Sequence, residues 1–97
     1  MITLPEEIDV TNSARLREAL LAVVGRRPAV VIADMSATTF CDSSGVNAIV
    51  TAYRQAVAAG GDLRLVIRHP AALRVFELSG VDTVIGTYPD LPSALSG

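Results

Sequence analysis

Apolar residues recur at helical spacing in three parts of the chain. In the first part they stand at i, i+3, i+4, i+7 and i+8, which is one face of an amphipathic helix. These residues are Leu16, Ala19, Leu20, Val23 and Val24. Asn12 or Ser13 is the expected N-cap and Gly25 the expected end of this helix, because short polar side chains favour the first position and glycine the last.

A second helical stripe predicts a helix over 43–59 that ends at Gly60-Gly61. Its apolar members are Val46, Ile49, Val50, Tyr53 and Val57. A third, shorter helix opens at His69-Pro70 and ends at Ser79-Gly80, since proline is tolerated in the first turn of a helix and glycine interrupts it. The residues LPSALSG at the end of the chain predict a last helical turn or two.

Two continuous apolar runs predict buried strands. PAVVIADMS at 28–36 and DLRLVI at 62–67 are rich in β-branched residues and do not alternate with polar ones, which is typical of strands covered on both faces. The first of them is expected at the centre of the sheet. The short runs at 2–4 and 8–10, separated by Pro5, predict a broken edge strand, and VDTVIG at 81–86 predicts a short last strand.

Strands that alternate with helices predict an α/β fold. Right-handed crossovers between them give a small, mostly parallel sheet, while the short N-terminal edge leaves a mixed sheet open. In such sheets the functional loops lie at the carboxyl ends of the strands. The residues FCDSSG at 40–45 lie at such an end, so we expect the site there.

Composition narrows the class of protein. With 97 residues, 51% hydrophobic and 19% charged, the chain is expected to form one globular domain over 1–97. No apolar run approaches the roughly 20 residues that cross a bilayer, and acids occupy the N-terminus where a signal peptide needs positive charge. The expected location is the cytoplasm, without membrane insertion.

The charge of the chain and its cysteine content argue against nucleic-acid binding, an internal disulfide and a structural zinc site. The net charge of −2 and the lack of a basic cluster beyond Arg26-Arg27 argue against a nucleic-acid partner. Cys41 has no second cysteine to pair with, and with His69 as the single histidine the chain cannot assemble a structural zinc site. We therefore expect no metal and no cofactor.

The DSSG element at 42–45 allows three interpretations. Asp42 or Ser43 can cap the following helix, but a cap does not explain Gly45, which suggests that another group approaches the backbone. A serine nucleophile needs a positioned base and usually a G-x-S-x-G turn, which is absent here. A serine that accepts a phosphate would place the anion at a helix N-terminus, where the fold tolerates it while a docked partner would meet added charge.

Several segments in order carry a resemblance to a known family: EEIDVTNSARLREAL at 6–20, VVIADMSATTFCDSSGVNAIV at 30–50, the Gly-Gly turn before DLRLVI, and LRVFELSGVDTVI at 73–85. Together they resemble the STAS family, specifically the single-domain anti-sigma factor antagonists of bacteria. The resemblance spans nearly the whole chain. It implies a small sheet with helices largely on one side, and a regulatory binding protein rather than an enzyme.

In such antagonists an anti-sigma factor that is also a serine kinase phosphorylates the serine after the motif aspartate, and a serine phosphatase removes the phosphate. The resemblance thus implies that Ser43 is the acceptor, with Ser44 as the alternate. The unphosphorylated form would bind the kinase and free a sigma factor. The implied partner-binding residues are Asp9, Asn12, Asp42, Ser44, Gly45, Val46 and Asn47, with Gly45 allowing close approach of the kinase.

The chain departs from the family pattern at several positions. Few residues precede PEEID, so we expect either a truncated edge strand or a late start of the sequence, and Glu6 stands where glycine is usual. Val46 and Asn47 replace a leucine and a glycine, and a larger, polar Asn47 on the docking face would change partner choice. Cys41 is expected in the core.

The fold is also compatible with other functions. The alternative is a STAS subunit or scaffold of a larger assembly, such as a stress-sensing particle or a lipid-transport complex, without an active phospho-switch. An enzyme acting on an ester or phosphate is the third class, and the absence of a base and of metal ligands argues against it.

Overall fold

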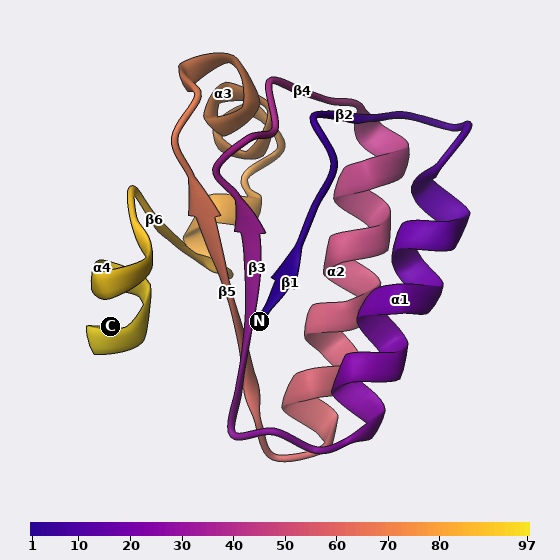
Figure 1. Cartoon of the computed structure of the whole chain (residues 1–97), viewed down its shortest axis with the longest axis vertical. Helices are drawn as coiled ribbons and strands as arrows, with labels where there is room; N and C mark the ends of the chain where they lie inside the picture. The colour runs from indigo at the N-terminus through magenta and orange to yellow at the C-terminus, as the bar shows by residue number, and fades with distance from the viewer.

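The computed structural model describes residues 1–97, and Figure 1 shows helices packed on a twisted sheet. Its elements follow in the order β1 (Ile2–Thr3), β2 (Glu7–Ile8), α1 (Ser13–Gly25), β3 (Val30–Met35), β4 (Phe40–Cys41), α2 (Ser43–Ala58), β5 (Asp62–Ile67), α3 (Pro70–Ser79), the 3-10 helix η1 (Val81–Thr83), β6 (Gly86–Tyr88) and α4 (Leu91–Ser96). The fold is α/β, as predicted.

The main sheet has the strand order β1-β3-β5-β6, and all its pairs are parallel. The two central strands, β3 and β5, pair along their full length, from Val30 opposite Asp62 to Met35 opposite Ile67. These are the two continuous apolar runs of the sequence, so the predictions of two buried strands and of a central position for the first are confirmed. The edge strand β1 has only two residues, in agreement with the expected short edge.

Successive residues of the central strands face opposite sides of the sheet. Val31, Ala33 and Met35 belong to a large core of 19 buried residues on the side of α1, α2 and α3, whose members include the fully buried Leu20 and Phe76. Ile32 and Val66 point to the other face, where Ala94 of α4 covers them. The helices therefore lie largely on one side, with the short α4 alone on the opposite side (Figure 1).

Two short strands stand apart from the main sheet and form the edge on which the predicted site lies. After Pro5 the chain forms β2, which pairs in parallel with β4, placing Ile8 opposite Cys41. The buried Thr38 holds this arrangement, because its hydroxyl donates a 2.7 Å hydrogen bond to the carbonyl of Pro5. The pairing carries the residues after β2 alongside the start of α2.

The predicted helix boundaries are confirmed to within one residue. Gly25 is the last residue of α1, as predicted, and the left-handed residue that then turns the chain is Arg27, with φ of 57°. Gly60 and Gly80, with φ of 85° and 77°, follow α2 and α3 as predicted. No helix combines the length and the apolar character needed to cross a membrane.

The predicted strand over 81–86 is wrong. Residues 81–83 form η1, in which the amide and the hydroxyl of Thr83 both donate to the carbonyl of Gly80, and the strand β6 begins only at Gly86. The β-branched residues of VDTVIG favour a strand in isolation. The left-handed Gly80 and these local hydrogen bonds outweigh that preference.

Candidate functional site

Asp42 caps α2, and the first turn of this helix carries the candidate site. Asp42 has extended backbone angles, and its Oδ1 accepts hydrogen bonds from the amides of Ser44 at 2.9 Å and Gly45 at 3.3 Å. The cap satisfies amides that would otherwise lack a partner at the first turn of α2. The turn is therefore held by a side chain that the sequence predicted for this role.

The two serines of the turn are not equivalent. Ser44 is half-buried, and its hydroxyl donates a 2.5 Å hydrogen bond to Oδ1 of Asp42. Ser43 is exposed, and its hydroxyl forms no hydrogen bond within the protein. Ser44 thus belongs to the cap, whereas the hydroxyl of Ser43 is free to react.

The cap makes the stability of the fold depend on pH. The hydroxyl of Ser44, and then the amides of Gly45 and Ser44, hold the pKa of Asp42 below its ordinary value of 3.8. A carboxyl whose pKa is lower in the folded state stabilises the fold above the unfolded pKa, and this stabilisation is lost as the pH falls through the folded pKa. The capping contribution should thus be complete at neutral pH and disappear in acid.

We expect Asp42→Asn, which keeps an oxygen acceptor but loses the charge, to be less stable than the wild type near pH 7 and equally stable near pH 2. Urea unfolding followed by circular dichroism measures both differences. Glu77→Gln is the control, because Glu77 is exposed and its side chain forms no hydrogen bond. A stability deficit of the Asp42 variant that persists unchanged in acid would contradict the assignment of a charged cap.

The loop between β2 and α1 lies next to this turn. Oδ1 of Asp9 accepts hydrogen bonds from the amide and the hydroxyl of Thr11, and the side chain of Asn12 accepts from the amide of Asp9 at 3.0 Å and donates to the carbonyl of Glu7 at 2.7 Å. Asn12 occupies the N-cap position of α1 but forms no capping hydrogen bond. The predicted N-cap position is therefore confirmed, but the side chain does not cap the helix, because its polar groups are used to fold the loop.

Gly45 and Val46 do not present side-chain surface to a partner. A Cβ on Gly45 would lie 2.5 Å from Cγ2 of Ile8 and 2.6 Å from Sγ of Cys41, and both Gly45 and Val46 are buried. The expectation that Gly45 allows close approach of a kinase is therefore wrong, because the approaching groups belong to this chain. Val46 lies in the core as part of the same packing.

The remaining predicted residues gather at one edge. The amide of Asp42 donates to the carbonyl of Ile8, so Asp9 follows β2 where Asp42 follows β4. Asn47 is exposed and lies one helical turn beyond Ser43 on the same face of α2. Asp9, Asp42, Ser43, Ser44 and Asn47 thus come together around the first turn of α2, whereas Asn12 lines a separate groove next to β1.

Sequence reasoning missed two apolar residues beside this turn. Val10 is 75% exposed after β2, and Phe40 is 49% exposed in β4. Exposed large apolar side chains next to a functional turn are typical of a surface that another protein covers. Phe40 directly precedes a buried cysteine, and the strand alternation between the two is the only signal that could have placed it outward.

No catalytic nucleophile is assembled here. Burial, and to a smaller extent the charge of Asp42, raises the pKa of Cys41 to about 11, so this thiol is not activated. His69 is exposed at the start of α3 and hydrogen bonds to neither serine. The residues at this edge provide no base for acyl transfer.

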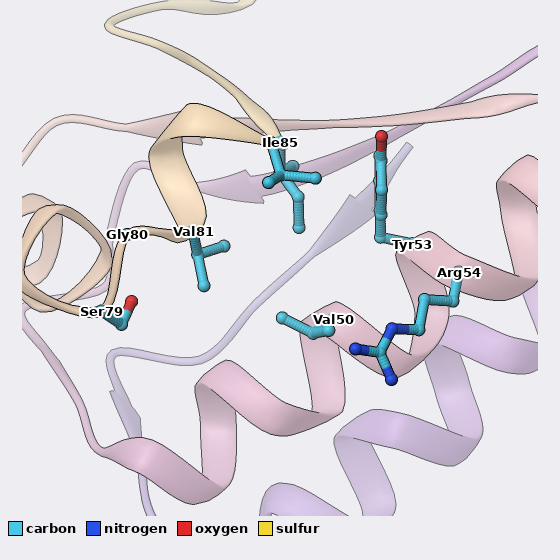
Figure 2. Close-up of a pocket in the computed structure, with 8 residues that line it drawn as sticks. Val50, Tyr53, Arg54, Ser79, Gly80, Val81 and Ile85 are labelled. Atoms are coloured by element: carbon cyan, nitrogen blue, oxygen red, sulfur yellow. The ribbon is translucent and has the colours of Figure 1, made fainter.

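A second concave surface lies away from the serines. A cavity of about 260 Å³ separates α2 from residues 79–85, and Figure 2 shows Val50, Val81 and Ile85 pointing toward it. Arg54 lies at its edge (Figure 2). None of the functional-site residues predicted from the sequence lines this cavity. Its lining also contains no acid–base pair.

Known proteins resemble this chain over its full length. The family model described as STAS domain matches residues 1–94. The anti-sigma-F factor antagonist RsfB of Mycobacterium tuberculosis is 29% identical over 97 residues, which are 100% of this chain and 79% of that protein.

Solved structures show the same fold. A crystal structure of an anti-sigma factor antagonist from Mycobacterium paratuberculosis is 32% identical and superposes with a TM-score of 0.88 over 97% of this chain and 80% of that one. The murine Slc26a9 anion transporter is 22% identical with a TM-score of 0.76, over 97% of this chain and 16% of the transporter. At that identity the second likeness concerns the fold alone.

Proposed function

Because this chain belongs to the STAS domain family, we propose that it acts as an anti-sigma factor antagonist controlled by phosphorylation. In this proposal the unphosphorylated chain binds an anti-sigma factor that is also a serine kinase, and so frees a sigma factor. Transfer of phosphate to Ser43 ends the binding, and a serine phosphatase restores it. The antagonists among the similar proteins support the general role.

The observation that carries the proposal is the free hydroxyl of Ser43 on a turn that is capped without it. Asp42 and Ser44 hold the start of α2, while Ser43 is exposed and unbonded. A phosphate there would sit at a helix N-terminus, where an anion gains about 0.3 to 1 kcal/mol. The fold would keep its shape after modification.

The surroundings of Ser43 explain why the modification would end binding. Val10 and Phe40 offer apolar surface on which a partner would dock, and Asp9 and Asp42 already place negative charge nearby. A phosphate adds about −1.5 to −2 charges, which the docked partner would have to desolvate beside these acids. The interface would be lost while the fold persists.

The same geometry favours Ser43 over Ser44 as the acceptor. A phosphate on Ser44 would break the hydrogen bond of its hydroxyl to Asp42 and place two negative groups together in the cap. Such a modification would disturb the start of α2 rather than only its surface. The proposed partner surface comprises Asp9, Asn12, Asp42, Ser44 and Asn47, to which we add Val10 and Phe40.

The proposal is tested by phosphorylation. The purified chain is incubated with ATP, Mg²⁺ and the anti-sigma factor kinase encoded in the same genome, and the phosphate is mapped by mass spectrometry. We expect one phosphate on Ser43, its absence in Ser43→Ala, and its retention in Ser44→Ala. Modification of neither serine by a kinase that is active on another antagonist would refute the switch, and modification of Ser44 alone would reverse the assignment.

A further inference from the structure

A polar groove lies between the first turns of α1 and α2, beside the turn that holds Ser43. It has a volume of about 220 Å³. Ala14 of α1 and Ala48 of α2 are among its lining residues. The residues that line it with polar groups are Ser13, Arg17, Ser44, Asn47 and Thr51.

Most of the free polar groups in this groove are hydrogen-bond donors. The guanidinium of Arg17, the amide of Asn47 and the hydroxyl of Ser13 form no side-chain hydrogen bond within the protein. The hydroxyls of Ser44 and Thr51 already donate, to Asp42 and to the carbonyl of Asn47. A ligand that accepts hydrogen bonds therefore fits the groove better than one that donates them.

Arg17 is the only charged residue that lines the groove, and no acid compensates it. Helix α2 contains no aspartate or glutamate over 43–58, and no acid stands three or four positions from Arg17 along α1. The one ion pair of the structure joins Arg64 to Asp62 elsewhere. The N-terminus of α1, which has no side-chain cap, also opens at this end of the molecule (Figure 1), which adds positive potential.

We infer that this groove receives the carboxylate of an aspartate or glutamate of the anti-sigma factor, held by Arg17 and Asn47. The inference rests on the proposed function and adds a residue that determines partner choice. Ser44 lines the groove directly after Ser43 in the chain, so a partner that covers Ser43 also reaches Arg17. The fork of donors on a guanidinium matches the two oxygens of a carboxylate.

The groove gives Asn47 a specific role. Its exposed amide lies at the same opening as Arg17, where it can donate a second hydrogen bond to the same carboxylate. A partner that carries a basic or apolar side chain at this point would leave the guanidinium desolvated and unpaired. The binding of such a partner is therefore disfavoured. The pair Arg17 and Asn47 would therefore select among anti-sigma factors.

The test compares two arginines of the same helix. Arg17→Ala should weaken binding to the anti-sigma factor about tenfold, with a smaller effect at high salt, whereas Arg15→Ala should change it less than about twofold. Arg15 is also exposed on α1 but lines a different groove, next to β1. Binding is measured by calorimetry at two salt concentrations, and thermal melts verify that both variants fold.

A charge exchange identifies the carboxylate. Arg17→Glu should bind more weakly still, and lysine in place of one surface acid of the anti-sigma factor should restore its binding. Equal affinities of the Arg17→Ala and Arg15→Ala variants would overturn this inference and leave the proposed function standing. If the wild-type chain bound no anti-sigma factor of its genome, the proposed function would fall first, and the inference with it.

Discussion

Gly45→Ala is expected to lower the free energy of unfolding by about 2 to 3 kcal/mol, because forced overpacking of a close-packed interior costs that much. The added methyl would lie 2.5 Å from Ile8 and 2.6 Å from Cys41. Both neighbours are fully buried in the core, and they stand opposite each other in β2 and β4. Ile8 cannot relieve the contact by rotating its side chain alone, because its Cβ also lies only 3.3 Å from the added methyl. Urea unfolding monitored by circular dichroism measures the loss.

Gly25→Ala is the matched control for this experiment. Gly25 is the last residue of helix α1, and a Cβ there would meet no atom within 4 Å. Alanine at such a position should leave the stability unchanged or raise it by up to about 1 kcal/mol, because alanine favours the helix. If both variants unfolded at the same urea concentration, the packing explanation of Gly45 would be wrong.

The sequence predicted those elements of the fold whose conformation depends only on the residues within the element. The run at 62–67 became β5 with the expected bounds, since six residues of a buried strand carry their own signal. The segment 81–86 was not predicted correctly, because its β-branched residues favour a strand while the conformation depends on Gly80 and on hydrogen bonds back to it. In this segment the residue types favour a strand, whereas the local hydrogen bonds favour a 3-10 helix, and the structure adopts the helix.

At the candidate site, the sequence predicted the capping role of Asp42 but not the structural reason for Gly45. The capping role of Asp42 follows from residue type and position alone. The reason for Gly45 lies in Ile8, which is distant in sequence and becomes a neighbour only through the pairing of β2 with β4. Asn12 lies at the predicted N-cap position, but its side chain bonds to the loop before it rather than to the helix after it, which the sequence did not indicate.

These corrections separate two properties of the turn. Its shape depends on Asp42, Ser44 and Gly45, which face the cap or the core. Its proposed chemistry depends on Ser43, which contributes to neither. A modification of Ser43 can therefore act on binding without first unfolding the helix, which is what a reversible switch requires.

Ser43→Asp is expected to weaken binding to the anti-sigma factor about 100-fold, because the docked partner would have to desolvate a second carboxylate beside Asp42. The new carboxylate would stand close to Asp42 and to the exposed Phe40, where a docked partner excludes water. Ser43→Ala should bind as well as the unphosphorylated wild type and no longer respond to ATP. Calorimetric titration with the purified anti-sigma factor compares the three proteins.

Two further variants isolate the position of the charge. Ser43→Asn has nearly the shape of the aspartate without its charge and should keep most of the binding. Gln55→Glu adds a negative charge at an exposed site farther along the same helix and should change it little. An acid in the first turn also favours the helix, so Ser43→Asp should be at least as stable as the wild type. Its loss of binding then cannot come from unfolding, and affinity equal to that of Ser43→Asn would exclude charge as the basis of the switch.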